Sequence, residues 1–171
     1  MTLLVDGYNL YFTGLRPGSK DKNLDRIRSA VIDAVAAYRV KRPVRAVIYF
    51  DGGRGERHMP QLQRIRGTEV KFSKSYGRSD EDIVNAVDYV RHPGDVCVVT
   101  SDVKLGESVR RLGASVISSR EFVERLSRLP KDKDAPPDDE PAIKYNTPDS
   151  DEVDYWLKVF SGKKGQRRLP R

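Results

Sequence analysis

Residues 3–9 read LLVDGYN, a short apolar run followed by an aspartate, a glycine, a tyrosine and an asparagine. Unbroken apolar residues indicate a strand buried on both faces, because a strand with one face in water alternates apolar and polar residues. Asp6 follows this run directly and is the first of several acidic residues that end such runs. The stretch therefore predicts a central strand of a parallel sheet with a carboxylate at its carboxyl end.

Apolar runs and helical patterns alternate along the next hundred residues. Further strands are predicted at 44–50, 69–72, 95–100 and 114–117, and helices at 24–41, 79–91, 103–112 and 119–128. Gly113 is placed to end the third helix, and Ser118 with Glu121 has capping-box spacing before the fourth. Strands that alternate with helices predict an α/β fold, a three-layer α/β/α sandwich with a mainly parallel sheet.

The pattern of the chain changes near residue 130. We predict an α/β domain at 1–129, an acidic Pro-rich linker at 130–148, an amphipathic C-terminal helix at 149–161 and a basic disordered tail at 162–171. The length of 171 residues suits one domain with a short appendage.

Charge and cysteine content narrow the class of protein. The formal net charge is +7, which favours a polyanionic partner such as nucleic acid or the ribosome. The one cysteine, Cys97, lies in an apolar run and is expected in the core, as suits a reducing cytoplasm. No run approaches the roughly 18 apolar residues of a membrane span, and no signal peptide is evident. We expect a soluble, cytoplasmic protein without a membrane partner.

Acidic residues gather at the predicted carboxyl edge of the sheet. Asp6, Asp51 and Asp102 end strands or follow them closely, and Asp80, Glu81 and Asp82 open a helix. Parallel strands present their carboxyl ends at one edge, so these residues should converge there. Two carboxylates 4 Å apart repel by roughly 4 kcal/mol at an effective dielectric near 20, so the cluster needs a cation or shifted pKa values. Oxygen ligands suit Mg²⁺ or Mn²⁺ rather than zinc.

Each acidic residue also has a structural interpretation, which the sequence leaves open. Asp102 can be the N-cap of the helix that follows it. The acidic residues after Ser79 can complement a helix dipole, with Ser79 as N-cap. Asp51, before two glycines, can be a turn residue.

Several motifs together resemble the NYN domains, a branch of the PIN-like nuclease superfamily, and in particular the YacP-like subgroup. The resemblance rests on residues 3–10 (LLVDGYNL), 50–52 (FDG), 79–83 (SDEDI), 99–102 (VTSD) and 118–122 (SSREF). The motifs occur in the order and spacing of the subgroup over residues 1–128. Arg78-Ser79 departs from the Thr-Ala that usually precedes the acidic pair.

The resemblance implies a PIN-like fold and a metal-dependent endoribonuclease that uses Mg²⁺ or Mn²⁺. It implies that Asp6 and Asp80 are the principal metal ligands, that Asp102 binds directly or through water, and that Asn9 orients the attacking water, Asp6 or a phosphate. The complete candidate sets are Asp6, Asn9, Asp80 and Asp102 for catalysis, and Asp6, Asp51, Asp80, Glu81 and Asp102 for metal binding. Because the subgroup includes an enzyme that acts on mRNA with the ribosome, the implied partners are single-stranded RNA or mRNA, and the ribosome.

A basic stretch at 54–78 carries a net charge of +5 and is the predicted RNA-binding segment. Its candidates are Arg54, Arg57, Arg64, Arg66, Lys71, Lys74, Tyr76 and Arg78, with the arginines and lysines on phosphates and the tyrosine on a base. A solvated surface is the alternative interpretation of the basic residues. We expect Tyr11 to pack in the core. For Tyr8 the sequence favours neither core packing nor base stacking.

Other functions compete with the nuclease hypothesis. A non-catalytic RNA-binding or ribosome-binding PIN-like module is the leading alternative, and a DNA nuclease of related fold is another. A haloacid dehalogenase-type phosphatase needs an aspartate where Tyr8 stands, and dinucleotide binding needs a glycine-rich G-x-G-x-x-G turn that the first strand lacks.

Overall fold

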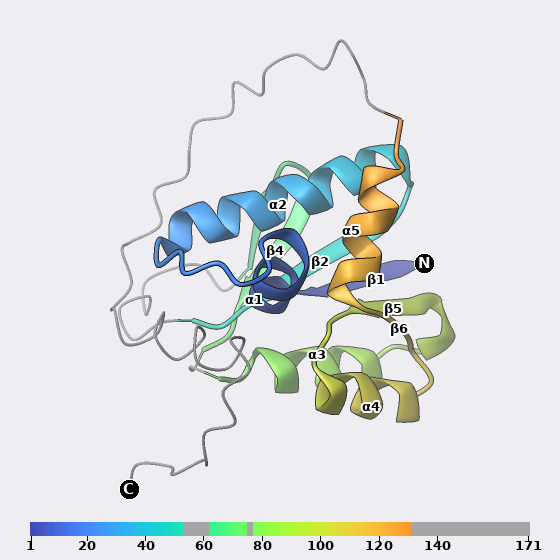
Figure 1. Cartoon of the computed structure of the whole chain (residues 1–171). Coiled ribbons are helices and arrows are strands. Elements are labelled where there is room, and N and C mark those ends of the chain that lie inside the picture. The colour runs from blue at the N-terminus through green and yellow to red at the C-terminus, as the bar shows by residue number, and fades with distance from the viewer. Residues whose placement is uncertain (53–61, 75–76, 131–171) are drawn as a thin grey trace, which may run out of the picture.

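The computed structural model of the chain describes residues 1–52, 62–74 and 77–130 (Figure 1). The predicted C-terminal helix and tail, and all of the predicted linker except Pro130, lie outside the described residues. The domain boundaries that we derived from the sequence therefore stay predictions.

Six strands form one sheet in the order β3-β4-β2-β1-β5-β6. They are β1 (Thr2–Asp6), β2 (Arg45–Phe50), β3 (Leu62–Ile65), β4 (Thr68–Phe72), β5 (Val96–Val99) and β6 (Ser115–Ile117). All neighbouring pairs are parallel except β3 with β4. The five predicted strands are confirmed. We did not predict β3, an antiparallel edge strand that carries only Leu62 and Ile65 as apolar residues.

Helices cover both faces of the sheet, so the three-layer sandwich is confirmed (Figure 1). The elements are α1 (Gly7–Asn9), the π-helix η1 (Leu10–Leu15), α2 (Leu24–Lys41), α3 (Ser79–Asp88), the 3₁₀ turn η2 (Pro93–Asp95), α4 (Val103–Arg111) and α5 (Ser119–Ser127). One apolar core lies between the sheet and η1, α2 and α5, and the second lies under α3 and α4. Strand β2 serves both, since Ile48 faces the first core and Val47 the second.

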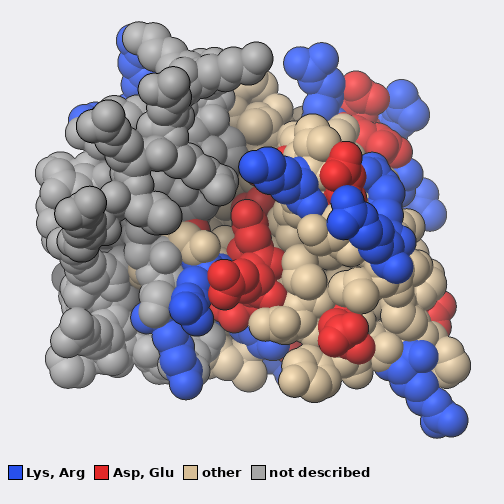
Figure 2. Space-filling view, turned by 90° about the horizontal axis from the view of Figure 1, so that it is seen from below, with Lys and Arg blue, Asp and Glu red and all other residues tan. Residues whose placement is uncertain are grey.

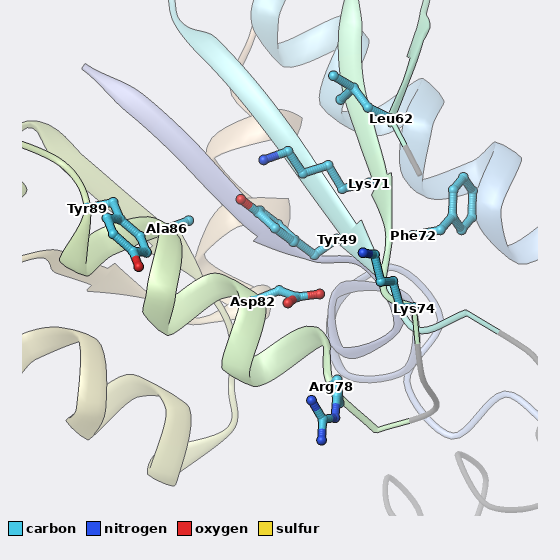
Figure 3. Close-up of a pocket in the computed structure, with 9 residues that line it drawn as sticks. All are labelled: Tyr49, Leu62, Lys71, Phe72, Lys74, Arg78, Asp82, Ala86 and Tyr89. Carbon is cyan, nitrogen blue, oxygen red and sulfur yellow. The ribbon is translucent and has the colours of Figure 1, made fainter. Parts of the chain in front are cut away.

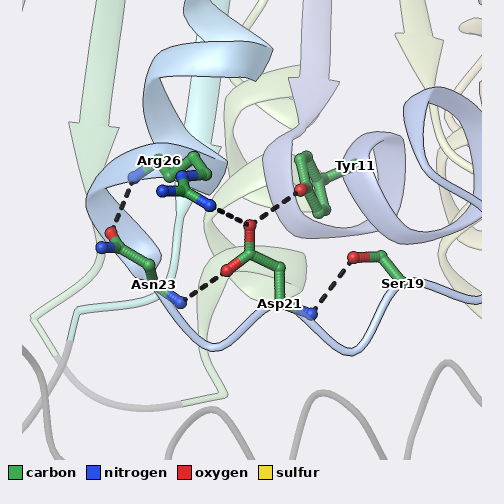
Figure 4. A network of polar contacts seen from close by, with 5 residues as sticks. All are labelled: Tyr11, Ser19, Asp21, Asn23 and Arg26. Atoms are coloured by element: carbon green, nitrogen blue, oxygen red, sulfur yellow. Dashed lines mark hydrogen bonds and ion pairs between the residues drawn. The ribbon is translucent and has the colours of Figure 1, made fainter.

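Capping residues and a glycine mark the ends of the helices. Helix α2 has the predicted bounds, and Asn23 caps it by accepting a hydrogen bond from the Arg26 N–H. Figure 4 shows how the loop before α2 is held: Asp21 accepts from the Asn23 N–H, at 3.0 Å, and from the Tyr11 hydroxyl, at 3.3 Å. Gly113 has a positive φ of 96° after α4, as its role of helix stop requires.

Two predictions for α3 and one omission need correction. Helix α3 ends at Asp88 instead of residue 91, because the Val90 N–H bonds the Val87 carbonyl, at 3.2 Å, in a tight turn that ends the α-helical pattern. Ser79 is the first helical residue and not the cap; Arg78 occupies the cap position and makes no side-chain capping bond. We predicted no helix between residues 7 and 15, where the structure has α1 and η1.

Candidate active site

The strand order of the sheet reverses at β1. Strands β2 and β4 lie on one side of β1, and β5 and β6 lie on the other. Open parallel sheets commonly bind their ligands at the carboxyl ends of the strands at such a reversal. Asp6 is the last residue of β1, and Asp102 follows β5. Two of the predicted ligands therefore lie at the reversal point.

Asp6 is a buried carboxylate, only 4% exposed. Its Oδ1 accepts a hydrogen bond from the Asn9 N–H at 3.2 Å, and its Oδ2 accepts one from the Thr100 hydroxyl at 3.1 Å. Burial raises the pKa of Asp6 well above its usual value, and the nearby carboxylates of Asp80 and Asp51 raise it further. The side chain therefore needs a proton or a cation at this position.

Asp51 directly follows β2 and is fully buried. Its Oδ1 accepts a hydrogen bond from the Ser79 N–H at 2.7 Å, which ties the end of β2 to the start of α3. Its Oδ2 is also buried and has no hydrogen-bond partner among the described residues. Burial raises the pKa of Asp51 to about 6, and Asp80 contributes to the rise. The turn interpretation is thus incomplete, since a turn residue needs no buried, unsatisfied oxygen.

The first turn of α3 supplies the third carboxylate. Asp80 lies close enough to raise the pKa of both Asp6 and Asp51 by repulsion. Glu81, also predicted as a ligand, is instead directed to solvent and forms an exposed ion pair with Arg78 at 3.8 Å. Figure 2 shows acidic side chains gathered in one patch with basic side chains beside it.

Asp102 is linked to the carboxylate of Asp6 through the Thr100 hydroxyl. Its Oδ1 accepts a hydrogen bond from the Leu105 N–H at 2.9 Å, so it is the N-cap of α4. Its own N–H donates to the Thr100 hydroxyl at 3.1 Å, and that hydroxyl in turn donates to Asp6. Asp102 is therefore both a helix cap and a member of the hydrogen-bonded chain that reaches Asp6.

Asn9 joins three segments that are distant in the sequence. Its side-chain oxygen accepts hydrogen bonds from the Ser101 N–H and the Ser119 hydroxyl, both at 2.7 Å, and from the Thr13 hydroxyl at 3.0 Å. With that oxygen occupied, any contact to water or phosphate would use the side-chain nitrogen. The four hydrogen-bonding partners around Asp6 and Asn9 were absent from our sequence-based candidates: Thr13, Thr100, Ser101 and Ser119.

Gly7 follows Asp6 because the chain passes very close to the core there. A Cβ at this position would lie 2.3 Å from the Phe50 ring. Any larger residue would push the start of α1, and with it the Asp6–Asn9 hydrogen bond, away from the end of β1.

The donor set suits a hard divalent cation. All three converging groups are carboxylates, and the buried, unsatisfied Oδ2 of Asp51 lacks the positive partner that such an atom requires. In the part of the chain that the structure describes, no group of three His, Cys, Asp or Glu side chains lies close enough to hold a metal alone. Mg²⁺ commonly takes only one or two carboxylates and completes its shell with water and substrate phosphate. The residues therefore fit Mg²⁺ or Mn²⁺ together with a phosphate ligand.

The predicted RNA-binding residues separate into three groups. Lys71, Lys74 and Arg78 line one pocket beside α3. Arg64 and Arg66 lie toward the opposite edge of the sheet, where they form ion pairs with Glu69 and Asp33. Arg54, Arg57 and Tyr76 lie outside the described residues.

The tyrosines near the first motif are core residues. Tyr11 is buried as expected, and Tyr8 is 1% exposed, packed on Phe50, and accepts a hydrogen bond from Arg28. Base stacking on Tyr8 is therefore excluded in this conformation.

A three-layer α/β/α sandwich, with carboxylates where the strand order of its sheet reverses, is the arrangement of a PIN-like nuclease domain. The sequence matches the YacP-like NYN domains over residues 3–156, and the chain belongs to this family of PIN-like nucleases. PIN-like nucleases generally use divalent metal ions. No curated protein matches the sequence significantly.

Solved structures agree with this assignment. The chain is similar to a tryptophan-to-leucine mutant of Rae1 (YacP) from Bacillus subtilis, with a TM-score of 0.60, 25% identity and 74% of each chain covered. The structure of Rae1 (YacP) without that mutation also has this fold, with a TM-score of 0.53, 24% identity and 74% of each chain covered. Within the described residues, none of the helices has the length and apolar character of a membrane span.

Proposed function

We propose that the protein is a metal-dependent endoribonuclease that hydrolyses internal phosphodiester bonds of RNA. The observation that carries this proposal is the convergence of Asp6, Asp51 and Asp80 at the reversal point of the sheet. Asp6 and Asp51 are buried there, and no cationic side chain among the described residues forms a hydrogen bond to either. Two buried carboxylates that lie near a third, with no cationic side chain bonded to either of the two, favour the binding of a cation.

Each residue has a distinct role in this proposal. Asp6 and Asp80 hold the metal ion, with Asp51 beside them and Asp102 reached through Thr100 or a water molecule. Bound Mg²⁺ or Mn²⁺ supplies positive charge that lowers the pKa of a water molecule and offsets charge on the scissile phosphate. Asn9 keeps the loops after β1 and β5 at a fixed separation, so that the carboxylates on them keep their positions.

The substrate context follows from the family and from charge. The net charge of +7 and the basic residues beside α3 favour a nucleic-acid substrate, and the family of PIN-like nucleases suggests RNA, as single strands or mRNA. The resemblance to the YacP-like subgroup further suggests action on mRNA at the ribosome, in the cytoplasm.

The test is cleavage of RNA by the purified full chain. Single-stranded and structured RNAs are incubated with Mn²⁺, with Mg²⁺ or with EDTA, and the products are resolved by size. We expect internal cuts that require metal and disappear in Asp6→Asn and Asp80→Asn. Asp95→Asn is the matched control, because Asp95 is exposed and precedes β5 at the opposite edge of the sheet.

Two outcomes would contradict the proposal. Undiminished cleavage in EDTA would exclude metal dependence. Tight RNA binding without cleavage under any metal condition would favour the non-catalytic RNA-binding module instead.

A further inference from the structure

A pocket of about 670 Å³ opens beside α3, over the side of the sheet formed by β2 and β4 (Figure 3). It combines the basic residues Lys71, Lys74 and Arg78 with the polar and aromatic residues Tyr49, Asp82 and Tyr89. Its volume is in the range of small-ligand sites, and its lining extends along α3 from Arg78 to Tyr89, which suits a short stretch of nucleic acid rather than one nucleotide.

The sequence of β4 explains why this side of the sheet is polar. Val70 and Phe72 face the core under α2, so the intervening Lys71 faces the opposite side. Lys71 pairs in register with Tyr49 of β2, and its ammonium group lies 5.4 Å from the centre of that ring. Tyr49 also belongs, with Val47 of β2 and Leu4 of β1, to the apolar core under α3 and α4. The pocket therefore begins where the apolar cover of this face ends.

The charges of the pocket favour an anion. Three basic side chains from β4, the following loop and the start of α3 line it, against the single carboxylate of Asp82. That carboxylate accepts a hydrogen bond from the Ser73 hydroxyl at 2.6 Å, which links α3 to the residue after β4. The ion pair of Arg78 with Glu81 is long and exposed, so it leaves most of the charge of Arg78 available.

Tyr89 supplies the aromatic surface. It lies at the end of α3, lines the pocket and is 88% exposed. Arg78 lies at the opposite end of α3, roughly 16 Å away at 1.5 Å per residue, so the ring and the guanidinium would contact different nucleotides of one strand. Single-stranded RNA binders combine exposed rings with cationic groups in this way, because unpaired bases stack on the rings while the backbone contacts the charges.

The pocket adjoins the carboxylates across a single turn of helix. Arg78 and Asp82 face the pocket, whereas Asp80 between them repels Asp6 and Asp51. Residues two apart project about 200° from each other around a helix axis, so the first turn of α3 separates the two sites. An RNA strand that crosses this turn would reach both.

We propose that this pocket binds a short stretch of single-stranded RNA next to the phosphate held at the carboxylates. One base stacks on Tyr89, and the phosphates of neighbouring nucleotides contact Lys71, Lys74 and Arg78. The position of this stretch relative to the cut depends on the proposed nuclease function, whereas the binding itself does not.

The test measures RNA binding without cleavage, so that it is separate from the nuclease assay. A short fluorescein-labelled single-stranded RNA and a duplex of the same length are titrated with the full chain in EDTA, and fluorescence anisotropy is recorded. Tyr89→Ala should weaken single-strand binding roughly tenfold, and Tyr89→Phe should restore it. Lys74→Gln should reduce the slope of log affinity against log salt by about 0.7. Arg42→Gln, an exposed cation after α2, should change neither quantity.

The outcomes separate the two proposals. If Tyr89→Ala binds single-stranded RNA as tightly as the unmodified chain, or weakens duplex binding equally, the pocket proposal is wrong. If the variants behave as expected but no RNA is cut with Mn²⁺ or Mg²⁺, the pocket proposal holds and the nuclease proposal fails.

Discussion

Acidic residues at the two edges of the sheet differ in their partners and in the direction of their pKa shifts. At the amino edge, Arg45 at the start of β2 donates two hydrogen bonds to Glu69 of β4, at 3.0 and 2.9 Å, and this contact lowers the pKa of Glu69. At the carboxyl edge, Asp6 and Asp51 are buried beside Asp80, and their pKa values are raised. Glu69 at the amino edge is thus paired with a cation, whereas no cationic side chain among the described residues is bonded to Asp6 or Asp51 at the carboxyl edge.

The difference indicates where the molecule performs its chemistry. An ion pair with an exposed guanidinium contributes little to stability and requires no ligand. Buried carboxylates without a cationic partner destabilise the fold, so their presence at one edge favours a ligand that removes the charge or offsets it.

The largest expected effect is that of Asp6→Asn on activity. The amide keeps the size of the side chain but removes its charge, so cleavage of RNA with Mn²⁺ should fall roughly 100-fold or more. The same variant should unfold at a higher temperature than the unmodified chain in EDTA, because the buried, repelled charge is gone. Cleavage assays and thermal unfolding measure the two effects, and a variant that loses both activity and stability would contradict this explanation.

The next effect is a loss of stability of the metal-free protein as pH rises. Asp51 has a pKa of about 6 in the fold against 3.8 as the usual value, so the folded state binds more protons between these values. Its favourable contribution is complete below pH 4 and is lost as pH rises through 6. The cost is about 3 kcal/mol at about 1.4 kcal/mol per pKa unit.

Urea unfolding in EDTA at a series of pH values measures this loss. Asp51→Asn should flatten the profile over that interval, and the raised pKa of Asp6 should leave a residual decline. A profile that Asp51→Asn leaves unchanged would show that Asp51 ionises normally.

A smaller effect is expected when the link between Asp6 and Asp102 is removed. Thr100→Val keeps the shape of the side chain but removes the hydroxyl that donates to Asp6 and accepts from the Asp102 N–H. We expect a stability loss of about 1–3 kcal/mol, since a buried N–H and a buried carboxylate each lose a partner. The kcat should fall with little change in KM, and Thr100→Ser should restore it; equal kcat values for Thr100→Val and the unmodified chain would exclude this positioning role.

The smallest effect is expected at the amino edge. Arg45→Gln should reduce the free energy of unfolding by about 0.2–1 kcal/mol, because the guanidinium is largely exposed. High salt should diminish the difference, and RNA cleavage should be unchanged. A loss of activity in this variant would mean that the two edges are coupled.

Much of the architecture was predictable because its signals are local. The apolar run before Asp6 predicted a central strand, and the amphipathic pattern of 24–41 predicted α2 with its observed ends. Edge strand β3 escaped prediction because it has neighbours on one side only and few apolar residues to mark it.

The convergence of the acidic residues was predictable from topology, but their local contacts were not. Glu81 turns to Arg78, and Arg64 and Arg66 form ion pairs far from the carboxylates, as only the packed structure reveals. The hydroxyls of Thr100 and Ser119 lay within the motifs that we quoted, so an inspection of polar residues next to the acidic ones would have found them.

The most direct test of the account is calorimetric titration of Mn²⁺ into the metal-free full chain. We predict binding that releases protons near pH 6, where Asp51 is partly protonated, and that is lost in Asp6→Asn but kept in Asp95→Asn. Equal Mn²⁺ affinity in the unmodified chain and in Asp6→Asn, or no Mn²⁺ binding at all, would contradict the claim that the carboxyl edge is a metal site.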